Sequence, residues 1–248
     1  MAKRTRKSPA KKKKGKSRKP APGTGLILRI RRWVWRGILV VLGFVVGMTA
    51  LYAVVNPPTT PYMFSENRRL GGVSYEYVAI ERIAPVMARS AVAAEDANFC
   101  LHWGLDVDAI RDRIERGGSG GASTISQQVV KNVFLWHGRS WVRKALEAMW
   151  TPLSEAIWSK DRILELYLNI AEFDEGVFGV QAASRHYFGI DASDLNSTQA
   201  ARLAAILPSP KTRSASNPSA AVQRRAVSIR DGAATIRADG RSACFNGE

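Results

Sequence analysis

The sequence predicts a mostly α protein that is preceded by one N-terminal transmembrane helix. In "APVMARSAVAAED", residues 84–96, the apolar side chains recur at spacings of three and four, which is the period of a helix. The same period runs through "RKALEAMWTPLSEAIW" and "KDRILELYLNIAEF", whereas no alternating β pattern of any length is visible. Nearer the N-terminus, Gly37–Val55 is a run of 19 residues without a charge.

The first 36 residues form a basic tail. They hold 15 of the lysines and arginines and no acidic residue, which leaves a charge of +1 for the other 212 residues out of the total of +16. A tail of Lys, Arg, Pro, Gly and Ser cannot bury a core, so we expect 1–36 to be disordered. It can lie on anionic lipid head groups. Nucleic-acid binding by the tail is the alternative, but the nearly neutral body favours no nucleic-acid partner.

Residues 37–55 are long enough to cross a hydrocarbon core of ~30 Å at ~1.5 Å per residue. A cleaved signal peptide is the alternative, and "MTALYA" offers it a weak small-residue site. The apolar run, however, exceeds the ~7–15 residues of a signal peptide. The positive charges before Gly37 predict a cytoplasmic N-terminus and a body outside the cytoplasm.

Three further segments follow. Prolines and turn residues predict an extended linker over 56–72. Helical periodicity predicts the folded domain over 73–220, and weak patterning predicts a loosely structured segment over 221–248. In an oxidising compartment, Cys100 and Cys244 either form one bridge or stay apart. The histidines lack ligand spacing, so no metal cluster is expected from them; they are His102, His137 and His186.

A run of glycines precedes "ASTISQQVVKN", residues 122–132. Thr124 and Gln127 form the pattern of a capping box, so a helix is expected to begin near Thr124. Thr124, Gln128 and Lys131 then share one face. A glycine loop before a helix N-terminus favours an anion, although it is not a P-loop, because no Gly-Lys-Ser/Thr follows. The alternative is a flexible loop and a surface helix.

Carboxylates stand in two other candidate clusters. Glu95 and Asp96 end an apolar helix beside aromatic residues, where burial can raise a carboxyl pKa and make it a general base; a solvated helix end is the alternative. Arg143 and Glu147 are four residues apart, the spacing of a helical ion pair. Two carboxylates, an anion site and several cations in a membrane-anchored domain suit glycosyl transfer from a lipid phosphate.

Five motifs, in order, carry a family resemblance: "EDANFCLHWG", "GASTISQQ" with "VVKN", "RKALE", "KDRILELYLN" and "RLAAIL". Over about residues 73–215 the chain resembles the peptidoglycan glycosyltransferases, glycosyltransferase family 51, especially their monofunctional biosynthetic peptidoglycan transglycosylase members. Ser126 replaces the usual Thr, and "NIAEFDEGVFG" varies a loop. The chain stops where bifunctional relatives continue into a transpeptidase domain, so we expect that activity to be absent.

The resemblance implies a lysozyme-like glycosyltransferase domain that polymerises lipid II with inversion. Glu95 would be the general base, Glu147 the second catalytic carboxylate, and Lys131 and Arg143 the ligands of the donor pyrophosphate. The other binding candidates are Gln128, Thr124, Ser123, Lys144 and Asn132. The supporting candidates are Asp96, Gln127, Glu165, Asn169 and Arg202. No cofactor is required with certainty, and the one candidate is a divalent ion, Mg²⁺ or Mn²⁺, near Glu147.

The implied location is the inner (cytoplasmic) membrane, with a single pass and an extracytoplasmic domain. The implied partners are lipid II, the nascent glycan strand, membrane lipid, and proteins of cell division or cell-wall synthesis. A mobile segment near the glycine loop is also implied. "FLWHGRSWV", Phe134–Val142, suits an element at the membrane interface, with an ordinary core-edge loop as the alternative. Two other functions stay open: a membrane-anchored lysozyme-like enzyme that cleaves glycan, and a non-enzymatic scaffold that binds lipid II or division proteins.

Overall fold

The computed structural model describes residues 24–115, 117, 123–138 and 140–246, and the chain forms two units, Met1–Val45 and Val46–Glu248. Helix α1, Thr24–Val54, runs from the first unit into the second. Within it, Leu26–Val54 is long and apolar enough to span a membrane, with a mean hydropathy of 2.3. The predicted span of 37–55 is therefore part of a longer helix.

The tail differs from the prediction where it is described. Residues 24–36 are helical rather than disordered, because no proline or glycine pair interrupts the chain between Leu26 and Arg36, and Arg residues alternate there with Leu, Ile, Val and Trp. The rest of the predicted tail, residues 1–23, lies outside the described residues. The second unit begins with the last turns of α1, where Thr49 accepts hydrogen bonds from the indole N–H groups of Trp150 (2.8 Å) and Trp158 (2.7 Å).

The predicted linker 56–72 was wrong over its second half, which forms helix α2, Pro61–Leu70. Its proline occupies the first helical turn, where no backbone N–H is needed. Thr60 caps the helix by accepting a hydrogen bond from the backbone of Met63, and Gly71 ends it with a φ of 75°. These start and stop signals are local, and they outweigh the reading of proline as a helix breaker.

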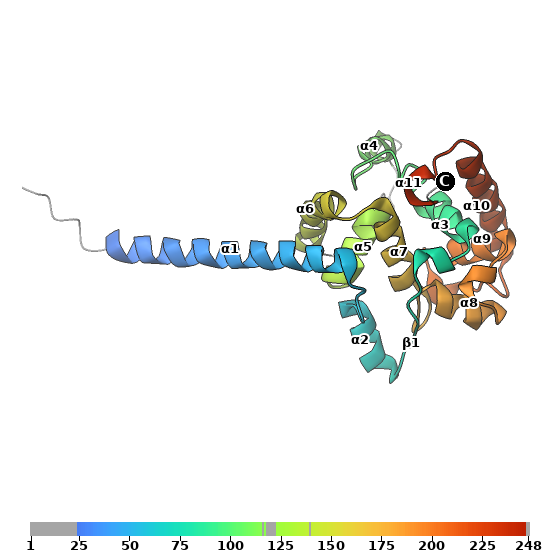
Figure 1. Ribbon diagram of the computed structural model, residues 1–248, viewed down its shortest axis with the longest axis horizontal. Helices are drawn as coiled ribbons and strands as arrows, with labels where there is room; N and C mark the ends of the chain where they lie inside the picture. Colours follow the sequence, from blue (N-terminus) through green and yellow to red (C-terminus); the bar gives the residue numbers. More distant parts are fainter. Residues whose placement is uncertain (1–23, 116, 118–122, 139, 247–248) are drawn as a thin grey trace, which may run out of the picture. The chain divides into compact units, whose positions relative to one another are not determined.

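The body is built from two groups of helices (Figure 1). In one group α3 (Pro85–Glu95), α9 (Ser197–Ile206) and α10 (Ala220–Ala238) pack on one another. In the other, α5 (Ile125–Phe134) packs on α6 (Trp141–Ile157) and α7 (Lys160–Ile170). The remaining helices are α4 (Val107–Glu115), α8 (Val180–Phe188) and α11 (Ala243–Asn246), with short 3₁₀ turns η1 (Ile80–Arg82), η2 (Ala192–Asp194) and η3 (Pro210–Thr212).

A small sheet accompanies the helices. Strands β1 (Ser74–Tyr75), β2 (Glu172–Asp174) and β3 (Val177–Phe178) lie in the order β1-β3-β2, with β1 parallel and β2 antiparallel to β3. Strands of two or three residues are too short to show the alternation that marks a half-buried strand. The sequence therefore gave no sign of them.

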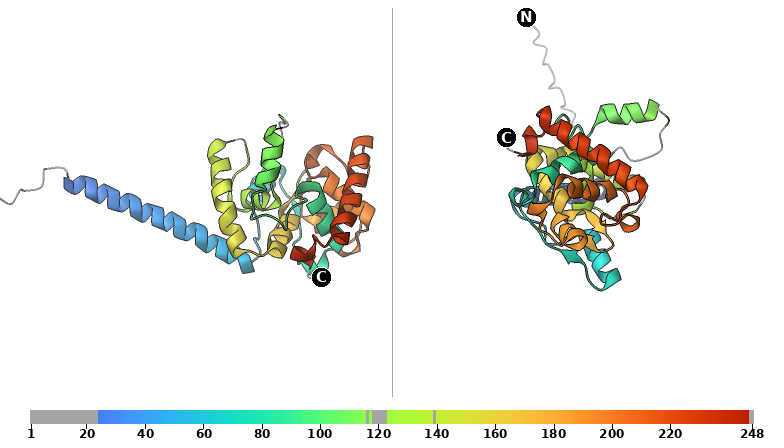
Figure 2. Two further views of the ribbon diagram at one scale, coloured as in Figure 1. Left: turned by 90° about the horizontal axis from the view of Figure 1, so that it is seen from above. Right: turned by 90° about the vertical axis from the view of Figure 1, so that its right-hand side faces the viewer.

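The predicted loose segment 221–248 was wrong for most of its length. Residues 220–238 form α10, which lies along α3 and α9 in both views of Figure 2. Its buried side chains fall at spacings of four and three; they are Val222, Ala226, Ile229, Ala233 and Ile236. Two of the five are alanines, so the stripe carries little hydrophobicity and is weak in the sequence, although it packs well.

The two cysteines form a disulfide bridge. Cys100 and Cys244 are joined with a Cα–Cα distance of 5.8 Å, across 144 residues of sequence. The bridge fastens α11 to the loop that follows α3, and Phe99 and Phe245 pack on each other beside it, with ring centroids 6.1 Å apart. Of the two open alternatives, the structure shows the bridged one.

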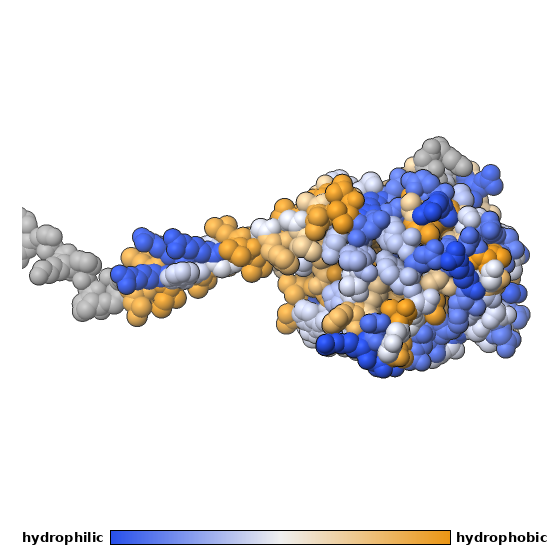
Figure 3. All heavy atoms as spheres, turned by 60° about the horizontal axis from the view of Figure 1, so that its bottom comes forward, coloured by the Kyte–Doolittle hydropathy of each residue, from blue (hydrophilic) through white to orange (hydrophobic). Residues whose placement is uncertain are grey.

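Apolar side chains gather at one end of the body surface in the view of Figure 3, whereas the opposite end is largely hydrophilic. Part of the Phe134–Val142 stretch lies inside: Phe134 stacks on Trp150 at 4.3 Å, and Leu135 is buried. Trp141 is 91% exposed and Val142 65% exposed. The stretch is thus a core edge on one side and an exposed aromatic surface on the other; residue 139 lies outside the described residues.

Candidate active site

Glu95 is the last residue of α3, at the junction of the two helix groups. Its side chain is 15% exposed. One carboxylate oxygen accepts a hydrogen bond of 3.0 Å from the amide of Gln128, and the other lies 3.6 Å from the guanidinium of Arg225. Burial raises the pKa of Glu95, while Gln128, Arg225 and Lys131 oppose that rise. A carboxyl group with a raised pKa at the edge of a cleft can act as a general base.

Helix α5 places Gln128 and Lys131. It begins at Thr124 as predicted, because the Thr124 hydroxyl accepts from the backbone of Gln127 (3.2 Å) while the Gln127 side chain accepts from the backbone of Thr124 (3.1 Å). That capping box occupies the buried side chain of Gln127, so of the two adjacent glutamines only Gln128 faces Glu95. Most of the glycine loop that is predicted to bind an anion, residues 118–122, lies outside the described residues.

Glu147 lies on α6 and is 2% exposed. Arg143 donates to one of its oxygens at 2.6 Å, and Lys144 forms an ion pair with the other. Lys144 also donates to the hydroxyl of Ser123 at 3.0 Å. One helix thus supplies a buried carboxylate with two cations at spacings of three and four, and the contact with Ser123 connects it to the start of α5.

Lys131 interacts electrostatically with both Glu147 and Glu95. Burial lowers its pKa, Glu147 raises it, and the nearby Arg143 and Lys144 lower it again. Because three cations surround a single buried carboxylate, the site around Glu147 carries an excess of positive charge. Such an excess suits an anionic ligand with more than one negative charge.

A cavity of about 170 Å³ opens beside Lys131. Gln128 and Asn132 line it from α5, and Tyr62 lines it from α2 with the ring of His137 stacked on it at 3.6 Å. Burial, together with Lys131 and Arg143, lowers the pKa of His137 to about 4, so its ring is neutral at neutral pH. Among the residues that the structure describes, the buried side-chain oxygen of Asn132 has no hydrogen-bond partner.

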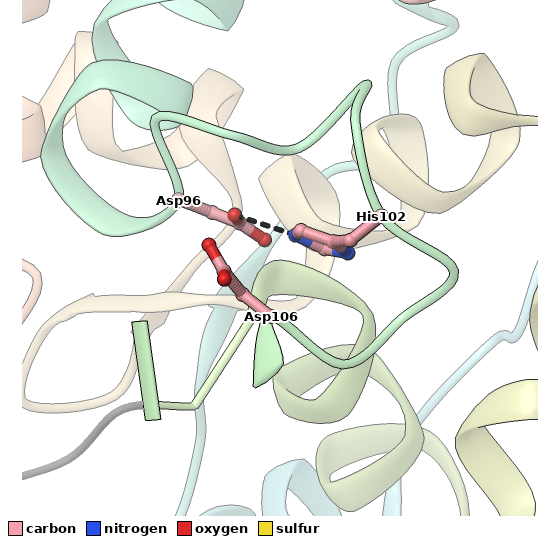
Figure 4. Close-up of side chains that lie close together, drawn as sticks. All are labelled: Asp96, His102 and Asp106. Carbon is pink, nitrogen blue, oxygen red and sulfur yellow. Dashed lines mark hydrogen bonds and ion pairs between the residues drawn. The ribbon is translucent and has the colours of Figure 1, made fainter. Parts of the chain in front are cut away.

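The side chain of Asp96 holds the loop that follows α3 in place through contacts of both carboxylate oxygens (Figure 4). One of its oxygens accepts from the backbone of Ile125 (3.0 Å), and the other contacts the ring of His102 (2.8 Å). Asp106 accepts from the backbone of Ala109 and from Asn98. All four carboxylate oxygens in this cluster thus have a protein partner, and the cluster holds the loop against the start of α5.

The other supporting candidates lie apart from the two catalytic candidates. Asn169 exchanges two hydrogen bonds of 2.8 Å with the backbone of Val78, and Glu165 accepts from Tyr77 and the backbone of Ile80. Both tie the chain before α3 to α7. Arg202 lines a groove of about 240 Å³ between α9 and α10, which includes no other candidate site residue.

The side chains near Glu147 do not fit a resident divalent ion. Metal sites of this class use several oxygen ligands, whereas both oxygens of Glu147 are paired with Arg143 or Lys144, and Lys131 lies nearby. A divalent cation there would be repelled by the three cationic side chains that surround Glu147.

Two features of the site were missed by the sequence analysis. Arg225 reaches Glu95 from α10; the spacing of small and apolar residues could have indicated the helix α10, but not the contact of Arg225 with Glu95. Glu155 accepts hydrogen bonds from Ser126 (2.5 Å) and Lys160 (2.8 Å), and Lys160 also donates to the backbone of His102. This buried network holds the same loop as Asp96.

Known proteins resemble this chain over most of its length. The transglycosylase family matches residues 65–233, from α2 into α10. A protein of Jannaschia sp. (strain CCS1) is 56% identical over 245 residues, which cover 99% of each chain. One of Pseudomonas putida (strain W619) is 50% identical over 194 residues, 74% of this chain and 82% of its own. One of Xanthomonas campestris pv. campestris (strain B100) is 46% identical over 212 residues, 81% and 86% of the two chains. All three are named biosynthetic peptidoglycan transglycosylase.

Proposed function

This chain belongs to the transglycosylase family and is a peptidoglycan glycosyltransferase, and on that premise we propose how its residues polymerise lipid II. The observation that supports the proposal is the arrangement around Lys131. Lys131 interacts electrostatically with both the buried Glu147 and the base candidate Glu95. A proton acceptor and a group of cations that can bind a leaving group are thus coupled through one lysine.

In the proposed reaction the growing glycan is the donor and is linked through pyrophosphate to a polyprenol. Glu95 takes the proton from the 4-hydroxyl of the incoming sugar. The oxygen attacks the anomeric carbon from the face opposite the pyrophosphate, a new glycosidic bond forms with inversion, and the bond to the phosphate oxygen breaks. The bonding electrons leave with the pyrophosphate, where Lys131 and Arg143 stabilise the charge that develops. Glu147 keeps these cations in place.

The proposed setting follows from the anchor. A single pass through the cytoplasmic membrane, with the basic N-terminus inside, places the body on the side where peptidoglycan is assembled. Lipid II and the nascent strand are then the substrates, and the exposed aromatic surface around Trp141 contacts membrane lipid. Proteins of cell division or cell-wall synthesis remain proposed partners.

The excess of cations distinguishes this function from its rivals. A glycan-cleaving enzyme acts on a substrate without pyrophosphate, so it has no use for Lys131 and Arg143. A scaffold that only binds lipid II or other proteins needs neither Glu95 nor Glu147 for chemistry. The test is a pair of assays on the purified full chain: polymerisation of labelled lipid II into glycan ladders, and digestion of isolated sacculi.

Wild type is expected to form ladders and to leave sacculi intact. Lys131→Ala and Arg143→Ala should each reduce ladder formation strongly, and their effects should be non-additive because both grip one leaving group. Arg82→Ala, an exposed charge change outside the cleft, is the matched control and should behave as wild type. If wild type digested sacculi but formed no ladders, the result would favour a glycan-cleaving enzyme. If it bound lipid II but had neither activity, the result would favour a scaffold.

A further inference from the structure

Glu95 occupies an unfavourable place for a carboxylate. It is the final residue of α3, and the C-terminal end of a helix carries partial negative charge from its unpaired carbonyl groups. The side chain is mostly buried, and the neighbouring Asp96 adds a like charge. A general base must nevertheless be ionised to accept a proton, so the structure has to supply a compensating cation.

Arg225 supplies positive charge at this point. Its terminal nitrogen Nη2 donates to the carbonyl oxygen of Ala94 at 3.2 Å and lies 3.6 Å from the carboxylate of Glu95. One guanidinium group thus neutralises both the end of the helix and the carboxylate on it. Its Nε is buried and has no hydrogen-bond partner among the residues that the structure describes, so those two contacts account for its position.

Helix α10 is well placed to hold this cation. It packs along α3, and a Cβ atom added at Gly232 would come within 3.3 Å of the Cβ of Ala93. The two helices therefore approach closely next to the residue pair that Arg225 contacts. A shift of α10 away from α3 would move the guanidinium from Glu95.

The other groups that face Glu95 cannot replace Arg225. Gln128 is neutral, Asp96 is an acid, and Tyr167 from α7 is a buried phenol whose pKa is raised by burial. Lys131 is a cation, but it also interacts with Glu147. From α9, Arg202 lines the groove toward α10 instead.

We propose that Arg225 is a positioning residue of the active site, which holds Glu95 in place and in its ionised form from α10. The proposal rests on the assignment of Glu95 as the general base. Its consequence has a definite sign. Loss of the cation raises the pKa of Glu95, so the ionised fraction of the base falls at and below neutral pH and recovers at higher pH.

The first experiment is the pH dependence of kcat/KM for lipid II polymerisation, for wild type, Arg225→Gln and Arg225→Lys. The acid limb of the Arg225→Gln profile should move up by roughly 1 pH unit, with a rate close to wild type on the alkaline side. Arg225→Lys keeps a cation, so the acid limb of its profile should move less. Arg224→Gln, which changes the adjacent exposed arginine, is the matched control and should leave the limb in place. A loss by the same factor at every pH, or an unmoved limb, would overturn the proposal.

The second experiment does not depend on turnover. Carbodiimide reacts with protonated carboxyl groups, and peptide mass spectrometry resolves its reaction at Glu95 from that at the exposed Glu81, which serves as the internal reference. The ratio of the two rates should fall with rising pH at a higher midpoint in Arg225→Gln than in wild type. Equal midpoints would refute the proposal, whether or not the protein polymerises lipid II. If Arg225→Gln does not fold, Arg225→Met, which also removes the cation, carries both measurements, and an unshifted profile together with an unshifted midpoint then rejects the role.

Discussion

Glu147 is a buried carboxylate and Glu95 a half-buried one, and their surroundings also differ. Glu147 is paired on both oxygens with cations of its own helix, whereas Glu95 has one amide donor and one arginine at 3.6 Å. Two carboxyl groups held in such different environments suit two roles. We therefore propose that the strongly paired Glu147 orders the cations of the leaving-group pocket and that Glu95 is the carboxylate that exchanges a proton.

Replacement of Glu95 by glutamine tests this assignment of different roles to Glu95 and Glu147. Glu95→Gln keeps the size and the contact with Gln128 but removes the base, so polymerisation should fall by about 10²–10⁴-fold. Binding of labelled lipid II should stay within a few-fold of wild type. Gel analysis of glycan products and a binding titration measure the two effects, and polymerisation near the wild-type rate would reject the assignment.

The sequence revealed those residue features that depend on near neighbours. Thr124 and Gln127 lie three residues apart, so the capping box that starts α5 was visible as a pattern. The contact between Glu95 and Arg225 spans 130 residues and depends on α10 lying along α3. No local pattern contains that information, and so Arg225 was missed while Glu95 was found.

At the scale of secondary-structure elements, the short helix α2 is attached to η3 by interactions between charged side chains. Glu66 accepts hydrogen bonds from Arg69 and from Lys211, which lies in η3. The pKa of Glu66 is lowered to about 2, chiefly by its hydrogen bond with Arg69 and further by Lys211. Because α2 supplies Tyr62 to the cavity beside Lys131, this charge cluster also shapes the site.

The lowered pKa predicts an acid-sensitive contribution to stability. The pKa of Glu66 in the folded state is below its ordinary value of 4.5, so the stabilisation is complete above pH 4.5 and is lost as the pH falls toward about 2. Glu66→Gln should lower the free energy of unfolding by about 1.5–3 kcal/mol at pH 7. The difference between variant and wild type should shrink as the pH falls from 4.5 toward about 2. Thermal unfolding in detergent over that range measures it, and a difference independent of pH would contradict the assignment to ionised Glu66.

The predicted elements were right where one apolar face was strongly hydrophobic, as in α7, and wrong where packing relies on small residues. Helix α10 buries Ala226 and Ala233, whose methyl groups contribute little to a hydrophobic pattern but allow helices to approach closely. Helix α2 is mostly polar and was read as linker, although Pro61 and Gly71 mark its ends. Both errors concern elements whose stability comes from their partners.

At the scale of the whole molecule, the anchor predicts a topology. The 15 positive charges in the first 36 residues predict that the N-terminus lies in the cytoplasm and the body outside it. A reporter that is active only outside the cytoplasm, fused after Glu248, should be active, and a cytoplasmic reporter at the same position should be silent. Activity of the cytoplasmic reporter would reverse the topology and remove the proposed substrate with it.

The bridge between Cys100 and Cys244 predicts a second property of the whole body. It closes a loop of 144 residues, so reduction should lower the free energy of unfolding by about 2–5 kcal/mol. Thermal unfolding with and without reductant measures this. The double variant Cys100→Ser/Cys244→Ser is the control: it should unfold like the reduced wild type and should not respond to reductant. A wild type that is indifferent to reductant would show that the bridge contributes nothing.

The oxidation state of Cys100 and Cys244 also reports on the biogenesis of the protein. Cys100 follows the helix that carries Glu95, and Cys244 lies beyond α10, which carries Arg225. If the body is exported, as proposed, the bond can close only after Cys244, which lies beyond α10, has left the translocation channel. A chain that carries the bridge would then have brought nearly the whole of its body across the membrane.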